Sequence, residues 1–339
     1  MNILTRQIKA AVATAVMAVG AQGASAQMAE YDNDEPITAT IAGYSSRGMV
    51  SVLGEGQAVV VRNAYPGSNV VYEPGNPAGS FVAVVNGERE FALETVIEMN
   101  KAMVGEAPFP ESYEGKFWLV TALSPERTLA HVYGRKAFLE EHGIKSFADI
   151  KEKEIPVRLG INQPGNLWVR GHVDAILAQY GMTKEDIEKF GGTLIEERTG
   201  ATIGLMRDGR ADIEITGGFV PIGGLIELNN TTPISFLEIS QEEAAGAAEE
   251  MGITTGVIPA DVYDFLDSDM PVPASTHYII AGPSATDEQV FKLAKALDTE
   301  LVAYQAMHPA LGDVTNEQIV PNVPGIPLHP AAKAYYESR

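Results

Sequence analysis

The amino-acid sequence predicts an α/β protein with two lobes. After residue 36, short apolar runs alternate with segments of helical periodicity, a pattern typical of α/β proteins. The 339 residues are enough for two lobes around a sizeable core, and a hydrophobic content of 45% is that of a globular chain. Loops rich in Gly, Ser, Asn and Pro follow several of the predicted strands, where ligands of such proteins bind.

Composition excludes several classes of protein. The absence of cysteine excludes a disulfide framework, a thiolate metal site, a cysteine nucleophile and a lipid anchor on cysteine. With 45 acidic and 24 basic residues, the formal net charge is -21. This charge argues against nucleic acid and against an anionic membrane surface as partners, because both need a basic footprint.

Residues 1–26 have the three parts of a secretory signal peptide. Arg6 and Lys9 form the basic region, residues 10–19 are apolar, and Ala24-Ser25-Ala26 is a small-residue cleavage pattern. The apolar run is shorter than the roughly 20 residues that a membrane span needs. Cleavage after Ala26 leaves 22 basic and 45 acidic residues, a net charge near -23. We therefore expect an exported protein of the periplasm without a membrane-inserted segment.

The first block of the mature chain reads as strand, helix and strand. Residues 37–42 are predicted to form a strand that ends in the loop 43–48. Residues 49–61 follow a helical pattern, although two glycines weaken it. Residues 69–73 are predicted to form a second strand, which the Pro- and Gly-rich residues 74–80 end.

A second block begins near residue 146. A helical turn at 146–150 precedes a predicted strand at 155–161, and the loop 162–166 then leads into a helix. One apolar stripe marks this helix, and Gly181 ends it; its members are Val169, Val173, Ile176, Leu177 and Tyr180. Further strands are predicted at 211–216, 233–237 and 276–281.

The C-terminal part contains a long amphipathic helix. Thr286 and Gln289 form a capping box at its start, and Pro309 follows its end. Its predicted buried face consists of Val290, Leu293, Leu297, Leu301 and Tyr304.

Motifs of catalysis are absent. The six histidines stand apart in the sequence, and none has the HExxH spacing of a zinc hydrolase. Residues 54–59 begin like a dinucleotide fingerprint but lack its third glycine. Carboxylates are too numerous for any pair to stand out, so an acid/base dyad stays open. We expect no enzymatic activity, no cofactor and no metal, with an exported hydrolase as one alternative and a ligand-sensing receptor subunit as another.

Three loops share one design. Residues 43–48, 75–80 and 162–166 each follow a predicted strand and precede a helix. In open α/β sheets ligands bind beyond the carboxyl ends of strands, where helix N-termini offer N–H groups suited to a carboxylate. Each loop taken singly is also an ordinary turn. Three strand ends that could meet in one cleft favour a binding site for an anion.

Three segments carry a resemblance to a known family. The C-terminal run VPGIPLHPAAKAYY at 323–336 is similar to a closing pattern of Pro-Leu-His-Pro-Gly-Ala and an aromatic pair. Residues 142–151 resemble Gly-Ile-Lys-Ser-Leu-Ala-Asp-Leu-Lys, and residues 206–212 resemble Leu-x-Asp-Gly-x-Ile-Asp. These patterns are typical of the substrate-binding proteins of TRAP (tripartite ATP-independent periplasmic) transporters, in the subgroup called TAXI.

The resemblance implies a two-lobed periplasmic binding protein (type II) fold with a ligand cleft between the lobes. The chain would cross twice between lobes, with 36–130 and 276–339 in lobe 1 and 131–275 in lobe 2. It also implies a small organic anion as ligand: a dicarboxylate, a 2-oxo acid or an acidic amino acid, such as 2-oxoglutarate or glutamate. The partner would be the membrane permease of the transporter, and we expect a monomer.

The resemblance also selects site residues, because the family's first ligand loop matches residues 42–51 and its second matches 164–168. The candidates of the first loop are Tyr44, Ser45, Ser46, Arg47 and Met49, and those of the second are Pro164, Gly165, Asn166, Leu167 and Trp168. Gly217 and Gly218 follow a further family pattern, with Phe219 next to them. Neutral donors complete the set: Asn76, Gly79, Ser80 and Asn162.

Two of these side chains have alternative roles. Arg47 stands where the family has small residues; it can bind a ligand carboxylate with two hydrogen bonds, or lie in solvent. Trp168 can form a wall of the pocket or pack in the core. The acidic residues Glu73 and Asp212 at strand ends are predicted to be structural, since buried anions repel an anionic ligand.

Overall fold

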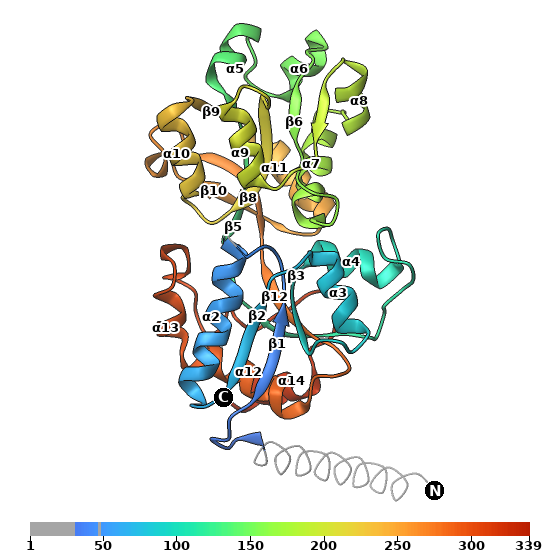
Figure 1. Ribbon diagram of the computed structural model, residues 1–339, viewed down its shortest axis with the longest axis vertical. Coiled ribbons are helices and arrows are strands. Elements are labelled where there is room, and N and C mark those ends of the chain that lie inside the picture. Colours follow the sequence, from blue (N-terminus) through green and yellow to red (C-terminus); the bar gives the residue numbers. More distant parts are fainter. Residues whose placement is uncertain (1–30, 47–48) are drawn as a thin grey trace, which may run out of the picture.

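The computed structural model describes residues 31–46 and 49–339, which form two α/β lobes placed end to end (Figure 1). The predicted signal peptide and Arg47 lie outside the described residues. Each lobe is built around its own sheet.

The sheet of the first lobe has the strand order β2-β1-β3-β12-β4. Strand β1 pairs in parallel with β2 and β3, whereas β12 runs antiparallel to β3 and β4. Its strands are β1 (Thr38–Ala42), β2 (Asn69–Glu73), β3 (Phe91–Thr95), β4 (Trp118–Ala122) and β12 (His277–Ala281).

Helices cover both faces of this sheet. One face packs against helices α2 and α12 through Ile41, Leu93 and Ile279, and the other packs against α3 through Ala92 and Ile280. The helices are α2 (Met49–Ala64), α3 (Pro77–Val85), α4 (Val96–Val104), α12 (Asp287–Thr299), α13 (Leu301–Gln305) and α14 (Pro330–Ser338), with the 3-10 turn η2 (Pro309–Leu311).

The sheet of the second lobe has the order β10-β11-β5-β8-β6-β7, and β9 pairs with β5. Its strands are β5 (Thr128–Arg135), β6 (Arg158–Gly160), β7 (Thr193–Ile195), β8 (Ile213–Gly218), β9 (Ile234–Phe236), β10 (Thr254–Ile258) and β11 (Met270–Ser275). The helices are α5 (Lys136–His142), α6 (Phe147–Lys153), α7 (Leu167–Gln179), α8 (Lys184–Lys189), α9 (Thr199–Arg207), α10 (Gly223–Thr231) and α11 (Gln241–Met251), with the 3-10 turn η1 (Ala260–Val262).

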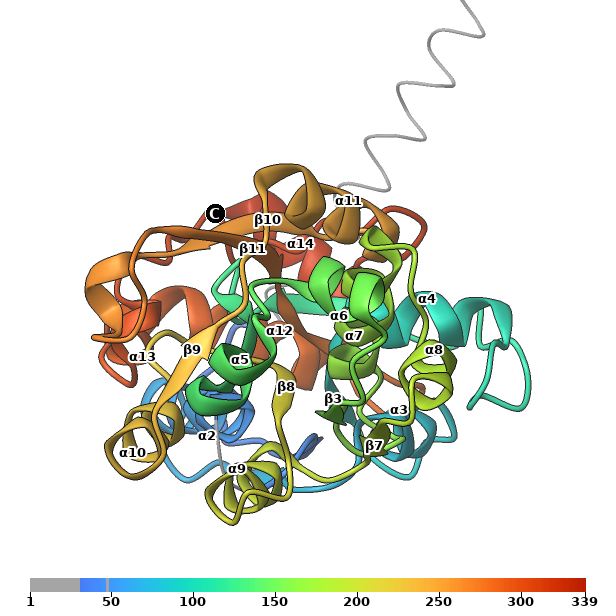
Figure 2. The same ribbon diagram turned by 90° about the horizontal axis from the view of Figure 1, so that it is seen from above.

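The chain passes between the two sheets at two places. It leaves the first sheet after β4 and enters the second at β5, and it returns directly from β11 to β12. At the boundary, α4 of the first lobe lies beside α7 of the second in both views (Figures 1 and 2). The exact residues that bound the lobes stay a prediction.

The predicted strand, helix and strand of the first block are confirmed as β1, α2 and β2, and α2 continues to Ala64. Gly54 and Gly56, which weakened the helix prediction, lie where α2 packs closely against other residues. A Cβ atom on Gly54 would lie 2.1 Å from the ring of Tyr72, and one on Gly56 would lie 2.7 Å from the sulfur of Met307. These two glycines thus let α2 lie close to its neighbours.

The second loop was predicted too long. Helix α3 begins at Pro77, within the predicted loop 74–80, because Asn76 caps it and proline fits the first helical position. Two strands of the second block also differ from prediction: β6 covers only Arg158–Gly160, and β8 runs from Ile213 to Gly218.

The predicted C-terminal helix is two helices. The capping box of Thr286 and Gln289 is present at the start of α12, and the whole predicted apolar face is buried. Helix α12 nevertheless ends at Thr299, and α13 begins at Leu301 after Glu300. Among the helices of the described residues, none combines the length and the hydropathy that crossing a bilayer demands.

Candidate functional site

The three predicted loops meet at the boundary between the lobes. Within the first lobe, the Ser80 hydroxyl donates a 2.8 Å hydrogen bond to the carbonyl oxygen of Gly43. Across the boundary, a Cβ atom on Gly165 would lie 1.9 Å from the amide nitrogen of Asn76, so Asn76 packs directly on the backbone of the third loop. The strand-end loops of both lobes therefore line one boundary.

The first loop is anchored by the second strand. The N–H group of Tyr44 donates to the Tyr72 hydroxyl at 2.8 Å, and that hydroxyl lies 3.4 Å from the carbonyl oxygen of Ser45. Tyr44 is buried, Ser45 is half-buried and Ser46 is exposed. The sulfur of half-buried Met49 lies 3.7 Å from the hydroxyl of Thr128, which begins β5. This first loop therefore reaches the first strand of the second lobe.

The second loop positions the start of α3. Asn76 is its N-cap, and its side-chain oxygen accepts from the N–H of Gly79 at 3.3 Å. Gly79 is exposed and Ser80 is buried. The amide of Asn76 thus has one face toward α3 and the other toward Gly165 of the opposite lobe.

The third loop is held by its own asparagines. Asn162 has a φ of 64°, a conformation that asparagine tolerates better than most residues, and its oxygen accepts from the Asn166 amide at 3.2 Å. Asn166 in turn caps α7, because its oxygen accepts from the N–H of Val169 at 3.2 Å. Pro164 is exposed and Leu167 is buried. Asn166 therefore caps α7 with its side-chain oxygen, and its role in ligand binding stays a prediction.

Trp168 contacts both lobes. Its backbone N–H donates to Oε1 of Glu98, in α4 of the first lobe, at 2.8 Å. Its indole N–H donates to the hydroxyl of Ser275, the last residue of β11, at 2.9 Å. The indole ring packs on two histidine rings, with centroid distances of 5.5 Å to His172 and 5.0 Å to His277.

Glu98 caps two helices at once. Thr95 and Glu98 form a capping box at the start of α4, in which the carboxylate accepts from the Thr95 N–H at 3.3 Å. The same carboxylate accepts from Trp168 in the first turn of α7. We expected the start of α7 to offer its N–H groups to a ligand. Glu98 and Asn166 already satisfy two of them, because an orphan N–H group so close to the core needs a partner.

The two histidines are neutral. Burial lowers the pKa of His172 to about 4, and burial together with nearby His172 lowers the pKa of His277 to about 3. Nδ1 of His172 lies 2.8 Å from the carbonyl oxygen of Trp168, so this nitrogen carries the hydrogen. Nδ1 of His277 lies 3.2 Å from the Thr128 hydroxyl and 3.4 Å from that of Ser124.

Glu94 is the second buried carboxylate at the boundary. It lies in β3, beside Thr95, which pairs with His277 of β12. Burial, reinforced by the charge of Glu98, raises the pKa of Glu94 well above its usual value. Burial, together with the charges of Glu98 and Glu94, also raises the pKa of the Tyr44 hydroxyl.

The remaining candidates lie at the end of β8. A Cβ atom on Gly217 would lie 2.7 Å from the indole of Trp168, and one on Gly218 would lie 3.0 Å from Ile222. Phe219 is buried and its ring packs on His308 of the first lobe, with centroids 4.7 Å apart. Gly217 thus makes room for Trp168, and Phe219 is a further contact between the lobes.

Of the two acids predicted to be structural, Asp212 is buried as that prediction assumed, whereas Glu73 is exposed. Glu73 pairs with Arg89 at 2.9 Å on the surface. Asp212 is buried and accepts from Arg135 at 2.6 Å and from Arg158 at 2.7 Å.

Sequence reasoning missed the acidic and histidine residues of the boundary. The pattern Thr95-x-x-Glu98 is a capping-box signature that could have located the start of α4. No local signal distinguishes Glu94, His172 or His277, because only the fold brings them together.

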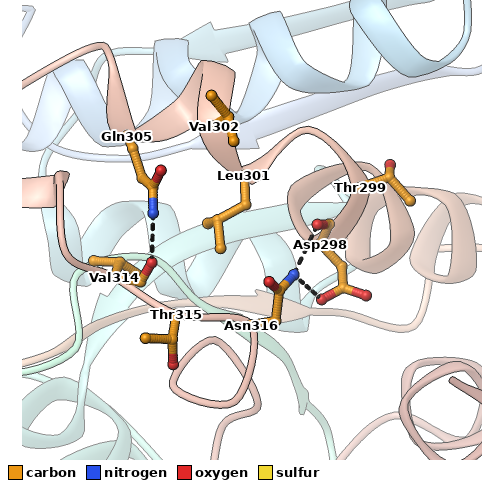
Figure 3. Close-up of a pocket in the computed structure, with 8 residues that line it drawn as sticks. All are labelled: Asp298, Thr299, Leu301, Val302, Gln305, Val314, Thr315 and Asn316. Carbon is orange, nitrogen blue, oxygen red and sulfur yellow. Dashed lines mark hydrogen bonds between the residues drawn. The ribbon is translucent and has the colours of Figure 1, made fainter.

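A hollow of about 400 Å³ lies elsewhere, in the first lobe between α12, α13 and the segment after η2 (Figure 3). Its polar groups bond to one another: Asn316 donates to the Asp298 carboxylate at 2.6 Å, and Gln305 donates to the carbonyl oxygen of Val314 at 2.7 Å. Since these groups are satisfied within the protein, the hollow is not the candidate site.

Comparison with known proteins identifies the family. Residues 58–338 match the NMT1-like family. The chain belongs to the NMT1-like family. No curated protein sequence matches this NMT1-like chain.

Solved structures share its fold. MatC of Rhodopseudomonas palustris with bound malate has a TM-score of 0.53 at 12% identity, covering 89% of this chain and 95% of MatC. PhnD1 of Prochlorococcus marinus in complex with methylphosphonate has a TM-score of 0.51 at 10% identity, covering 83% and 91%. The R. palustris protein Rpa4515 with adipate has a TM-score of 0.50 at 13% identity, covering 78% and 83%. The NMT1-like chain therefore has the predicted two-lobed periplasmic-binding-protein fold.

Proposed function

We propose that this NMT1-like protein is a periplasmic solute-binding protein of a TRAP transporter of the TAXI type. It captures a small organic anion between its lobes and delivers it to the membrane permease. The observation that carries this proposal is the meeting of strand-end loops from both lobes, where Asn76 packs on Gly165 and Trp168 bonds to Glu98.

The mechanism is a shift between open and closed lobes. Trp168 and Phe219 contact the opposite lobe in this structure, and in the proposed mechanism these contacts form as the lobes close and stabilise the closed form. A ligand held by both lobes adds its own contacts to the closed form and shifts the population toward it. The permease then recognises the closed shape.

The class of ligand follows from the loops and the relatives. The three solved structures named above hold malate, methylphosphonate and adipate, all small anions. For this chain we propose a dicarboxylate, a 2-oxo acid or an acidic amino acid such as glutamate. Arg47 and the loop that contains it are proposed to bind a ligand carboxylate by charge-assisted hydrogen bonds.

Export and organisation are part of the proposal. Residues 1–26 are a signal peptide, lobe 1 consists of 36–130 and 276–339, and lobe 2 consists of 131–275. The protein works in the periplasm as a monomer.

A hydrolase is less well supported. Ser124 and His277 are close enough to suggest a nucleophile and its base. A general base works best with a pKa near the operating pH, and burial holds the pKa of His277 at about 3. The Ser124 and His277 pair is therefore poorly suited to act as nucleophile and general base.

The test of the proposed function is ligand recovery followed by thermal unfolding. Mass spectrometry of small molecules released from the purified, denatured protein should detect a small organic acid. Adding that acid at about 100 times its Kd should stabilise the native protein by about 2.7 kcal/mol. A protein that releases no small acid, and whose melting temperature no dicarboxylate, 2-oxo acid or amino acid raises, is not this kind of binding protein.

A further inference from the structure

Buried polar atoms without partners gather at the lobe boundary. Nine buried side-chain nitrogen or oxygen atoms in the described residues have no hydrogen-bond partner. Five of the nine belong to this boundary: the Tyr44 hydroxyl, both carboxylate oxygens of Glu94, and Nε2 of His172 and of His277. Proteins rarely leave such atoms unpaired, because burial deprives them of water.

These side chains form one connected group. The ring centroid of Tyr44 lies 5.6 Å from that of His277, and the Trp168 ring lies between His277 and His172. Glu94 directly precedes Thr95 in β3, and Thr95 pairs with His277 in β12. The unpaired atoms thus come from both lobes, and they lie around Trp168, which contacts both lobes.

Three of these five atoms are acceptors when Glu94 is ionised, namely its two oxygens and Nε2 of His172, and the Tyr44 hydroxyl supplies one donor. Nδ1 of His172 gives its hydrogen to the carbonyl oxygen of Trp168, so Nε2 is left with a lone pair only. Burial raises the pKa of Glu94, and a bound cation opposes that shift; beside a cation the carboxylate is ionised and only accepts hydrogen bonds. Neighbouring Glu98 adds a further carboxylate, whose hydrogen bonds from Thr95 and Trp168 are all accepted ones. The single Tyr44 hydroxyl cannot pair with three acceptors, so a ligand that completes this group brings further donors, and a cation matches the two carboxylates best.

We propose that Glu94 binds an ammonium group of the ligand, so that the solute is an amino acid rather than a dicarboxylate or a 2-oxo acid. This inference rests on the proposed function and narrows its ligand class. The ammonium group supplies three N–H donors and one positive charge. In the protein alone, neither carboxylate oxygen of Glu94 has a hydrogen-bond donor. Glu94 is therefore the residue that determines specificity at this site.

The experiment compares the affinities of compounds that differ only in the group on carbon 2, which is an ammonium group, an oxo group or hydrogen. Isothermal titration of the full mature chain uses L-glutamate, 2-oxoglutarate and glutarate, together with four other amino acids and their matching 2-oxo acids. We expect at least one amino acid to bind at least ten-fold more tightly than its 2-oxo acid. Equal or tighter binding of the 2-oxo acids overturns the inference and leaves the proposed function standing. Failure of every compound, and of every acid recovered from the protein, overturns both.

Substitution assigns the preference to one residue. Glu94→Gln keeps the shape and removes the charge, and it should reduce the preference for the amino acid to less than three-fold. Glu214→Gln is the matched control, because Glu214 is equally buried but lies in the second lobe, where Tyr133 donates to it. An unchanged preference in Glu94→Gln overturns the role of Glu94. If that variant does not fold, as circular dichroism would show, Glu94→Asp replaces it and should lower amino-acid affinity while the preference persists; an unchanged affinity overturns the proposal.

Discussion

Two buried carboxylates, Asp212 in the second lobe and Glu94 at the lobe boundary, have opposite surroundings. Hydrogen bonds from Arg158 and Arg135 outweigh burial and hold the pKa of Asp212 below its usual value. Glu94 has no donor among the described residues, and burial raises its pKa. Asp212 has all its hydrogen-bond donors within the protein, whereas the described residues provide none for Glu94. Burial alone therefore does not distinguish Glu94 from Asp212; the lack of a partner for both of its oxygens does, and this is why we propose Glu94 as a ligand-binding group.

The largest effect should come from removing the satisfied carboxylate. Asp212→Ala leaves two arginines without the acceptor that they share, and should lower the free energy of unfolding by about 3 kcal/mol. Urea unfolding measures this loss. Glu73→Ala is the control, because its exposed ion pair with Arg89 is screened by solvent and should contribute little to the free energy of unfolding. Equal effects of the two variants would break the distinction between structural and surface acids.

A pH series sharpens the comparison with a third acid. Burial raises the pKa of Glu214 to about 8, and the hydrogen bond from Tyr133 only partly opposes this. Between its unfolded value of 4.5 and about 8, the native state holds a proton that the unfolded state has lost, so stability falls as pH rises. Between about pH 5.5 and pH 7, the free energy of unfolding of the wild type should fall by about 2 kcal/mol relative to that of Glu214→Gln. Parallel stability curves for the two proteins would show that Glu214 does not carry this proton.

The smallest effect concerns the contact between the lobes. In Gly165→Ala the new methyl group collides with the Asn76 amide, a flexible side chain that can move at a modest cost. We expect solute affinity to fall by about three- to ten-fold, or about 1 kcal/mol. Gly200→Ala in α9 is the control, since its methyl group meets open space. Unchanged affinity in Gly165→Ala would mean that the solute-bound form does not close at this contact.

Much of the frame was predictable because it depends on neighbours in sequence. The capping box of Thr286 and Gln289, the apolar stripe of α7 and the small-residue loops at strand ends are local patterns, and the structure has all of them. The ends of elements were less predictable. Proline at the first position of α3 reads as a loop residue until the Asn76 cap is seen.

The composition of the site was predictable only in part. The loops lie together as expected. The side chain of Asn166 caps α7, and Glu98 accepts a hydrogen bond from one of the N–H groups that we expected to face a ligand. Glu98 lies 70 residues from Trp168, and Ser124 lies 153 residues from His277. No periodicity or spacing connects residues so far apart.

The sequence by itself determined the α/β class, the strand-end loops and the helix caps, because hydrogen bonds and apolar stripes within a few residues select them. Only the tertiary structure decided which polar side chains share the lobe boundary and which of them lack partners. Those properties depend on how two sheets are placed by a chain that passes between them twice. Burial then turns an ordinary glutamate such as Glu94 into a group that needs a donor from outside the protein.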